Sequence, residues 1–131
     1  MDEKEILKER FKAAISSAVK VISEQHNLEV KFGTSTNSKN ETLNLPEILA
    51  LKNLQDFINL RAFADSEALK IRYTDKKIYL KNEPKTPMAK SLYAIAEKIR
   101  YEKLGSNKLK GIKNNLIKCY ENKFKNKKIS E

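Results

Sequence analysis

Residues 93–105, YAIAEKIRYEKLG, have the pattern of an amphipathic helix that ends at a glycine. Upstream, Thr86 is a suitable N-cap and Pro87 a suitable first helical residue, so the helix is predicted to begin there. Its buried stripe is predicted to consist of Met88, Leu92, Ile95 and Ile99. Gly105 is predicted to be the C-cap. The chain has only three glycines and three prolines in 131 residues, which favours a helical fold.

Three charged side chains stand out in this helix: Glu97, Arg100 and Glu102. On the preceding helical segment, Arg61 and Asp65 are four residues apart and fall on the apolar stripe rather than on the solvent face. We predict a structural charge network that cross-links the two helices and fixes their register, made of Arg61, Asp65, Glu97 and Arg100. An orphaned buried charge costs roughly 3–5 kcal/mol, so Arg100→Ala or Asp65→Ala is predicted to be strongly destabilising.

Two chemical interpretations of the same carboxylates are disfavoured. The first is a metal site with oxygen ligands from Asp65, Glu97 and Glu102. It is disfavoured because Arg61 and Arg100 would largely neutralise the charge of these carboxylates. Glu97 and Glu102 would form an acid/base pair, but five residues along one helix separate them by about 140°. The sequence therefore predicts no catalytic, cofactor-binding or metal-binding residue in this chain.

The N-terminal third is predicted to contain one helix and two short strands. Residues 3–25 place apolar side chains at spacings of three and four, which is typical of an amphipathic helix. Residues 28–32, LEVKF, alternate as a half-buried strand does, and residues 42–45, TLNL, are the candidate second strand. Between them, residues 33–41 are rich in Gly, Ser, Thr and Asn, which predicts a mobile loop or a hairpin connection.

The remainder of the chain is predicted to be mostly helical. A helical stripe follows Pro46 and continues to Tyr73, with a break near residue 52 left open. Residues 75–84 are predicted to form another short strand, and a last helix is predicted from residue 107. The fold class is thus mainly α (α+β): four or so amphipathic helices packed as a bundle with a two- or three-stranded sheet. A single domain is predicted over residues 1–125, followed by a basic tail at 126–131.

The chain is strongly basic, with a net charge of +10, and the excess lies at its C-terminal end. Residues 103–131 contain nine lysines against two glutamates. This excess fits either an electrostatic surface for a partner or a composition with no binding role. On the last helix, the lysines predicted to face away from the apolar stripe are the candidate partner-binding residues: Lys110, Lys118, Lys125 and Lys128.

Several classes of protein are disfavoured by what the sequence lacks. No apolar run approaches the ~20 residues that span a bilayer, and the acidic N-terminus is unlike a secretory signal, so a cytoplasmic protein without a membrane partner is expected. A single cysteine, Cys119, and a single histidine, His26, cannot build a disulfide or the usual zinc site. The common nucleotide-binding and hydrolase motifs are also missing.

The second half of the sequence resembles the N-terminal region of CobT, the T subunit of the aerobic, ATP-dependent cobaltochelatase. The resemblance covers about residues 11–116 and rests on order and spacing across RAFADSEALK (61–70) and YAIAEKIRYEKLGSNKLKGIKNNL (93–116). The positions that carry the family pattern are Arg61, Asp65, Ala68, Leu69, Tyr93, Glu97, Arg100, Glu102, Gly105, Gly111, Ile112, Asn115 and Leu116.

The resemblance implies a role in cobalamin biosynthesis. In that family the parent complex uses ATP and Mg to insert cobalt into hydrogenobyrinic acid a,c-diamide, with an N subunit and an AAA+ S subunit as partners. The metal-binding D-x-S-x-S signature of the family's C-terminal domain is missing here. The resemblance therefore implies an N-terminal helical domain that lacks catalytic residues and any cofactor of its own, and that docks onto the S or N subunit.

The alternative is a small basic nucleic-acid-binding helical domain, whose affinity would fall steeply with salt. Against it stand the lack of a recognition motif and the shortage of arginine, with four arginines among 27 basic residues. No aromatic stacking platform is expected on the basic face either. Nucleic acid is therefore disfavoured as the partner.

Overall fold

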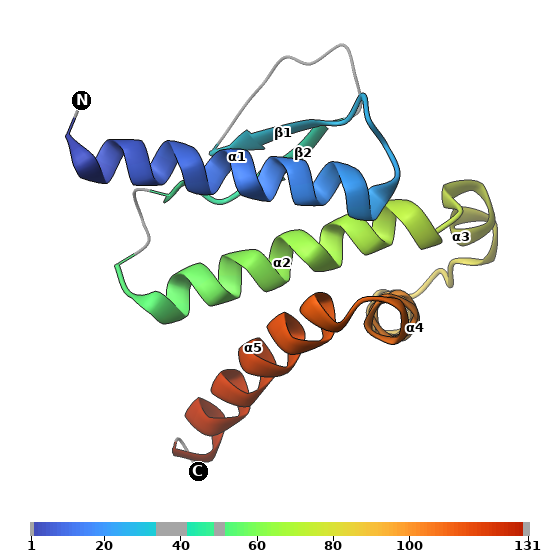
Figure 1. The fold of residues 1–131 in the computed structure, drawn as a ribbon. Helices are drawn as coiled ribbons and strands as arrows, with labels where there is room; N and C mark the ends of the chain where they lie inside the picture. The colour runs from blue at the N-terminus through green and yellow to red at the C-terminus, as the bar shows by residue number, and fades with distance from the viewer. Residues whose placement is uncertain (1, 34–41, 49–51, 130–131) are drawn as a thin grey trace.

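The computed structural model describes residues 2–33, 42–48 and 52–129, with the backbone alone for 126–129. The described residues form five helices and two short strands (Figure 1). The elements are α1 (Glu3–Ser23), β1 (Glu29–Phe32), β2 (Thr42–Leu45), α2 (Leu54–Tyr73), α3 (Lys76–Asn82), α4 (Pro87–Lys108) and α5 (Lys110–Ile129). This mainly helical fold with a small sheet confirms the predicted fold class.

Helices α1 to α4 each begin after a side chain that caps a free N–H group of the first turn. Asn53 and Asp56 form a reciprocal capping box at the start of α2, so this helix begins after the break that the sequence left open. Asp75 caps α3, accepting hydrogen bonds from two backbone N–H groups. Thr86 caps α4 with Pro87 in its first turn, as predicted.

Helix α2 is the centre of the fold. It contacts α1 on one side and α4 and α5 on the other, while α4 crosses it at a steep angle and is seen almost end-on in Figure 1. Every helix except α3 contributes buried apolar residues, as does β2, and the residues of β1 are half-buried. The largest fully buried side chains include Ile15, Leu45, Ile48, Leu69 and Val19. Because three helices pack on α2, its position determines where α4 and α5 lie.

The two strands form a parallel pair, not a hairpin. Their register sets Val30 opposite Leu43 and Phe32 opposite Leu45, and β2 buries both leucines. The prediction of strands at both places is confirmed, whereas the hairpin alternative is wrong because the two strands run in the same direction. Residues 34–41, which fall in the predicted loop, lie outside the described residues.

The strand predicted at 75–84 is wrong, since α3 occupies this segment. Two features of its sequence were ambiguous. Asp75 can begin either a turn or a helix, and in the structure it is the N-cap of a helix. Ile78 and Leu80 alternate with Tyr79 over too few residues to distinguish the period of a strand from that of a helix. The ring of Tyr79 packs against the ring of Tyr93 from α4, with their centroids 4.6 Å apart, which holds the short helix in place.

Two predictions about α4 are also wrong. The apolar stripe expected to be buried is exposed: Met88 by 78%, Leu92 by 63%, Ile95 by 55% and Ile99 by 65%. The helix instead buries Tyr101, Glu102 and Gly105 against the rest of the molecule. Gly105 is not a C-cap, because the helix continues to Lys108; its missing side chain allows Leu69 of α2 to approach the backbone closely.

Candidate functional site

The predicted charge network is divided into two groups, of which the first joins α2 to α5. The Asp65 side chain is fully buried on α2, with its Oδ1 3.1 Å from Nε of Arg61. Asn115 of α5 donates a hydrogen bond of 2.8 Å to Oδ2 of the same carboxylate. Burial raises the pKa of Asp65, while Asn115 and Arg61 act in the opposite direction. These contacts fix the position of α5 against α2.

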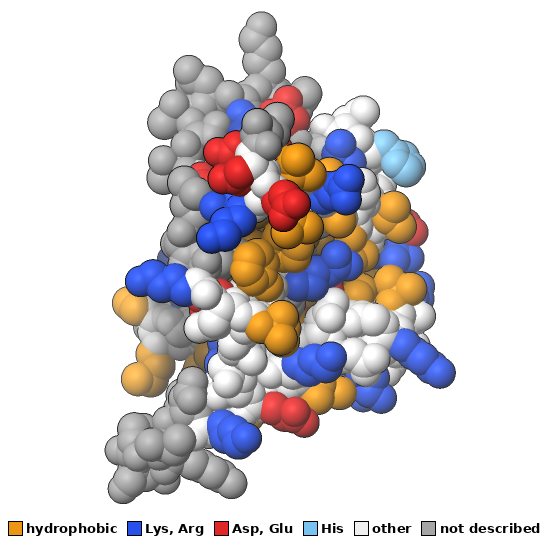
Figure 2. All heavy atoms as spheres, turned by 60° about the vertical axis from the view of Figure 1, so that its left-hand side comes forward, with side chains coloured by type: hydrophobic (Ala, Val, Ile, Leu, Met, Phe, Trp, Pro, Cys, Tyr) orange, Lys and Arg blue, Asp and Glu red, His pale blue; other side chains and the backbone are white. Residues whose placement is uncertain are grey.

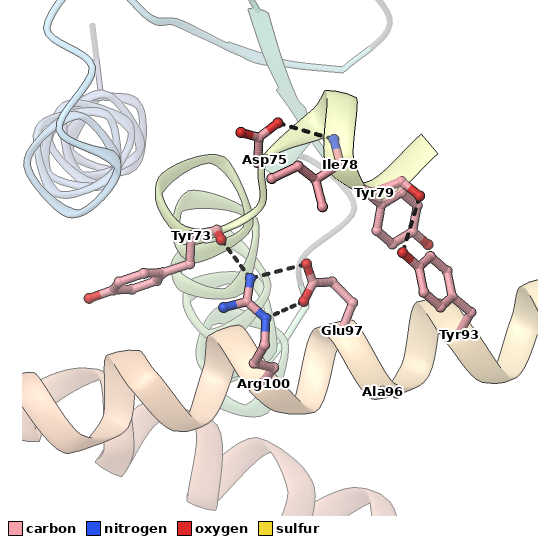
Figure 3. Close-up of a pocket in the computed structure, with 8 residues that line it drawn as sticks. All are labelled: Tyr73, Asp75, Ile78, Tyr79, Tyr93, Ala96, Glu97 and Arg100. Carbon is pink, nitrogen blue, oxygen red and sulfur yellow. Dashed lines mark hydrogen bonds and ion pairs between the residues drawn. The ribbon is translucent and has the colours of Figure 1, made fainter. Parts of the chain in front are cut away.

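The second group joins α4 to the end of α2. Arg100 donates hydrogen bonds to both carboxylate oxygens of Glu97, and its guanidinium also donates to the backbone carbonyl of Tyr73 at 2.5 Å (Figure 3). Thr74 Oγ1 donates to Glu97 Oε2 at 2.9 Å. The hydrogen bonds from Arg100 and Thr74 lower the pKa of Glu97 despite its partial burial. This group holds the last turn of α2 on α4.

Glu102 belongs to a third group, which sequence reasoning did not find. Its carboxylate accepts hydrogen bonds from Ser66 of α2 at 2.5 Å and from Tyr120 of α5 at 2.6 Å. Burial and the hydrogen bond to Glu102 both raise the pKa of Tyr120. Glu102 therefore links three helices at one point. No sequence pattern identifies the hydroxyls of Ser66 and Tyr120 as partners of Glu102, although Ser66 lies next to Asp65 in the sequence.

The three carboxylates considered for a metal site thus have separate partners. Asp65 binds Arg61 and Asn115, whereas Glu97 and Glu102 lie in the other two groups. Within the described residues no cluster of three or more potential metal ligands is present. What these side chains do in the structure is hold helices together.

A hollow of about 470 Å³ lies between α3 and α4 (Figure 3). Its walls carry Tyr79 and Tyr93, and the hydroxyl of Tyr93 donates to the carbonyl of Tyr79 at 3.1 Å. Glu97 and Arg100 form another part of the wall. Because these two charges are paired with each other, the hollow offers aromatic surface and little free charge.

The most unusual surface is the exposed apolar row on α4, which we call the α4 seam and define as Met88, Leu92, Ile95 and Ile99. These residues follow one another at intervals of four, three and four, which is the a/d spacing of a coiled-coil helix. Isolated apolar side chains are common on protein surfaces, but a contiguous row marks a contact surface. Each of the four residues is more than half exposed in the structure.

A second hollow, of about 380 Å³, adjoins the α4 seam. Ile95 of the seam and Leu80 of α3 both line it, and Leu80 is 60% exposed. The charged side chains along its walls are Lys70, Lys76 and Lys98. Among the described residues that line this hollow, none carries a carboxylate. Apolar surface and positive charge are therefore combined beside the seam.

The predicted partner-binding lysines of α5 are distributed along the exposed side of that helix. Lys110, Lys118 and Lys125 are exposed, and none of these three forms an ion pair in the described part of the chain. The side chain of Lys128 lies outside the described residues. On the face in Figure 2, Lys and Arg side chains are dispersed among hydrophobic ones rather than gathered into one block.

The fold and these surfaces define a small, basic, mainly helical protein module whose carboxylate groups tie its helices together. Residues 6–131 match the family described as cobalamin biosynthesis protein CobT, and the chain therefore belongs to this family, which acts in cobalamin biosynthesis. No solved structure was found to match the chain. In the described residues, no helix is both long enough and apolar enough to cross a membrane.

Proposed function

We propose that this chain is a non-catalytic docking domain of a cytoplasmic cobaltochelatase, which inserts cobalt into hydrogenobyrinic acid a,c-diamide at the expense of ATP. Its partners are the AAA+ S subunit and the N subunit. The observation that carries the proposal is the α4 seam, a row of four large apolar side chains left exposed in a CobT-family chain. Cobalt and ATP are handled elsewhere in the complex.

The energetics of the seam support a docking role. Burying a large aliphatic side chain that was exposed to water is worth roughly 1.5–3 kcal/mol, so four such residues would stabilise a complex substantially even after the costs of association. The seam also stands on a fixed support. Glu102 and Gly105 hold the C-terminal half of α4 against α2, and Glu97 holds its middle. A partner would therefore meet a helix that is already in place.

The test is capture of the purified S and N subunits by this chain, with a matched pair of double variants. Leu92→Ser with Ile99→Ser removes apolar surface from the seam. Leu7→Ser with Val21→Ser removes the same kind of surface from α1, where the two side chains are 64% and 69% exposed. We expect the seam variant to lose capture and to lower chelatase activity, while the α1 variant keeps both.

Two results would overturn the proposal. One is failure of the unmodified chain to capture either subunit, together with full chelatase activity when the domain is deleted. The other is binding to duplex or single-stranded DNA or to RNA with an affinity that falls steeply with salt, which is the behaviour of a nucleic-acid-binding domain. Equal melting temperatures of the variants would show that loss of capture does not come from unfolding.

A further inference from the structure

We propose that the α4 seam binds an acidic amphipathic helix, in which carboxylates flank a row of apolar side chains. This inference rests on the proposed function and specifies the chemistry of the partner. Three observations carry it: the spacing of the seam, the charges at its edges and the inward position of the carboxylates of α4.

The spacing of the seam favours a helical partner. Intervals of four, three and four place Met88, Leu92, Ile95 and Ile99 in one narrow stripe along three turns, about 16 Å at 1.5 Å per residue. Helices pair through such stripes by inserting side chains between those of the partner. The positions beside the stripe include Ala89 and Ala96, whose small side chains leave room for a second helix to approach. A partner segment of three to four turns would cover the seam.

Positive charge lies on both edges of the seam. At about 100° per residue, Lys98 falls on one side of the stripe and Lys103 on the other, and both are exposed. Lys70 and Lys76 extend the positive charge across the hollow that Ile95 and Leu80 line. A helix with Glu or Asp beside its apolar row would match this arrangement, whereas one with Lys or Arg there would be repelled.

The carboxylates of α4 offset only part of this charge. Glu97 is bound by Arg100 and Thr74. Glu102 is bound by Ser66 and Tyr120 and also lies 4.0 Å from Nζ of Lys98, whereas the charge of Lys103 at the other edge has no such partner in the described part of the chain. These are the only two acidic residues in α4. Both are turned toward the rest of the molecule, which leaves the solvent-facing side of the helix apolar at its centre and positive at its edges.

The same charges disfavour a second copy of the chain as the occupant. Pairing two α4 helices through their seams would bring the edge lysines of one copy against those of the other, with no exposed carboxylate on either helix to separate them. Like charges at these positions destabilise helix pairs. The chain as a whole adds to the repulsion, because its net charge is +10.

The experiment uses two synthetic helical peptides of three heptads, both with Leu at positions a and d. One carries Glu at positions e and g, and the other carries Lys there. Binding to the chain is measured by fluorescence anisotropy at two salt concentrations. We expect the acidic peptide to bind, more weakly at the higher salt, and the basic peptide to fail.

Two charge-reversal variants locate the effect. Lys103→Glu, at the edge of the seam, is expected to lower the affinity for the acidic peptide by roughly threefold to tenfold, because one exposed ion pair is replaced by a repulsion. Lys4→Glu, at an exposed position of α1, changes the net charge equally and is expected to leave the affinity unchanged. Leu92→Ser should abolish binding of the peptide, whereas Leu7→Ser should not.

Equal binding of both peptides, or equal weakening by the two lysine variants, would overturn the inference. So would sedimentation showing a dimer that Leu92→Ser dissociates, because the occupant would then be a second copy. Failure of the proposed function looks different. Subunit capture that depends on the seam without any preference for the acidic peptide retains the docking role and removes only the acidic partner. Binding of the acidic peptide without capture of either subunit would retain the acidic partner and remove the docking role in the cobaltochelatase.

Discussion

Replacing Gly105 by alanine tests the packing of α4 on α2. In an open position of a helix this change would add roughly 1 kcal/mol of stability, because alanine favours the helix more than glycine does. At Gly105 the added Cβ would lie 2.9 Å from Cγ of Leu69 and closer still to both of its methyl carbons. Leu69 is completely buried, so its side chain has no free space into which to turn.

The clash should outweigh the gain in helix propensity. Overpacking a well-filled core costs typically about 1–3 kcal/mol, and relieving three contacts requires either Leu69 or the whole of α4 to move. We therefore expect Gly105→Ala to lower the free energy of unfolding by about 1–2 kcal/mol. For a chain of this size that corresponds to a fall in melting temperature of roughly 3–8 °C.

Gly111 provides the matched control. A Cβ added there meets nothing within 4 Å, and the residue lies in the first turn of α5. Gly111→Ala should therefore leave stability unchanged or raise it by up to about 1 kcal/mol. Urea denaturation of both variants measures the difference, and a Gly105→Ala protein as stable as the Gly111→Ala protein would refute the close packing of α4 on Leu69.

Four further predictions concern the polar groups. Asp65→Ala should destabilise by about 2–3 kcal/mol in urea denaturation, because it removes a buried carboxylate from its two partners. The sequence predicted that Arg100→Ala would be strongly destabilising, but the Arg100 side chain is 48% exposed, so we now expect a cost of about 1 kcal/mol or less. A larger loss for Arg100→Ala than for Asp65→Ala would contradict the contacts described. The pKa of Glu97 is lowered from its ordinary value of 4.5, so the ionised carboxylate stabilises the fold at pH values above 4.5. This stability is lost as the pH falls through the folded-state pKa. Glu97→Gln should therefore lose less unfolding free energy in acid than the unmodified chain does. Burial raises the pKa of Tyr101 from 10.0 to about 12, so the free energy of unfolding should fall as the pH rises across this interval. A Tyr101→Phe variant should lose less unfolding free energy over the same interval than the unmodified chain. An ultraviolet titration measures the ionisation of the phenol directly.

Elements with strong local signals were predictable from the sequence. The first helix, both strands and the Thr86–Pro87 start of α4 were all found, because caps and apolar periods are encoded within a few residues. The helix in segment 75–84 was not predictable, because seven residues are too few to show the helical period of apolar residues. What settles it is a tertiary contact, the packing of Tyr79 on Tyr93.

The candidate site shows a different limit. The sequence predicted a structural role for charged residues of α2 and α4, but it could not predict their partners. Thr74 and Ser66 donate to Glu97 and Glu102 of α4, and Asn115 donates to Asp65 of α2. Hydroxyl and amide groups leave no periodic signal in the sequence. The apolar stripe was assigned to the core because sequence periodicity cannot distinguish a core from a docking face.

Side-chain footprinting with hydroxyl radicals would show whether the α4 seam is the docking surface. Met88 of the seam is 78% exposed and Phe124 of α5 is 63% exposed, so both should be oxidised in the free chain. In the presence of the cobaltochelatase S and N subunits, we expect protection of Met88 and its seam neighbours with little change at Phe124. Protection of Phe124 and the α5 surface, with Met88 still oxidised at its free rate, would contradict it.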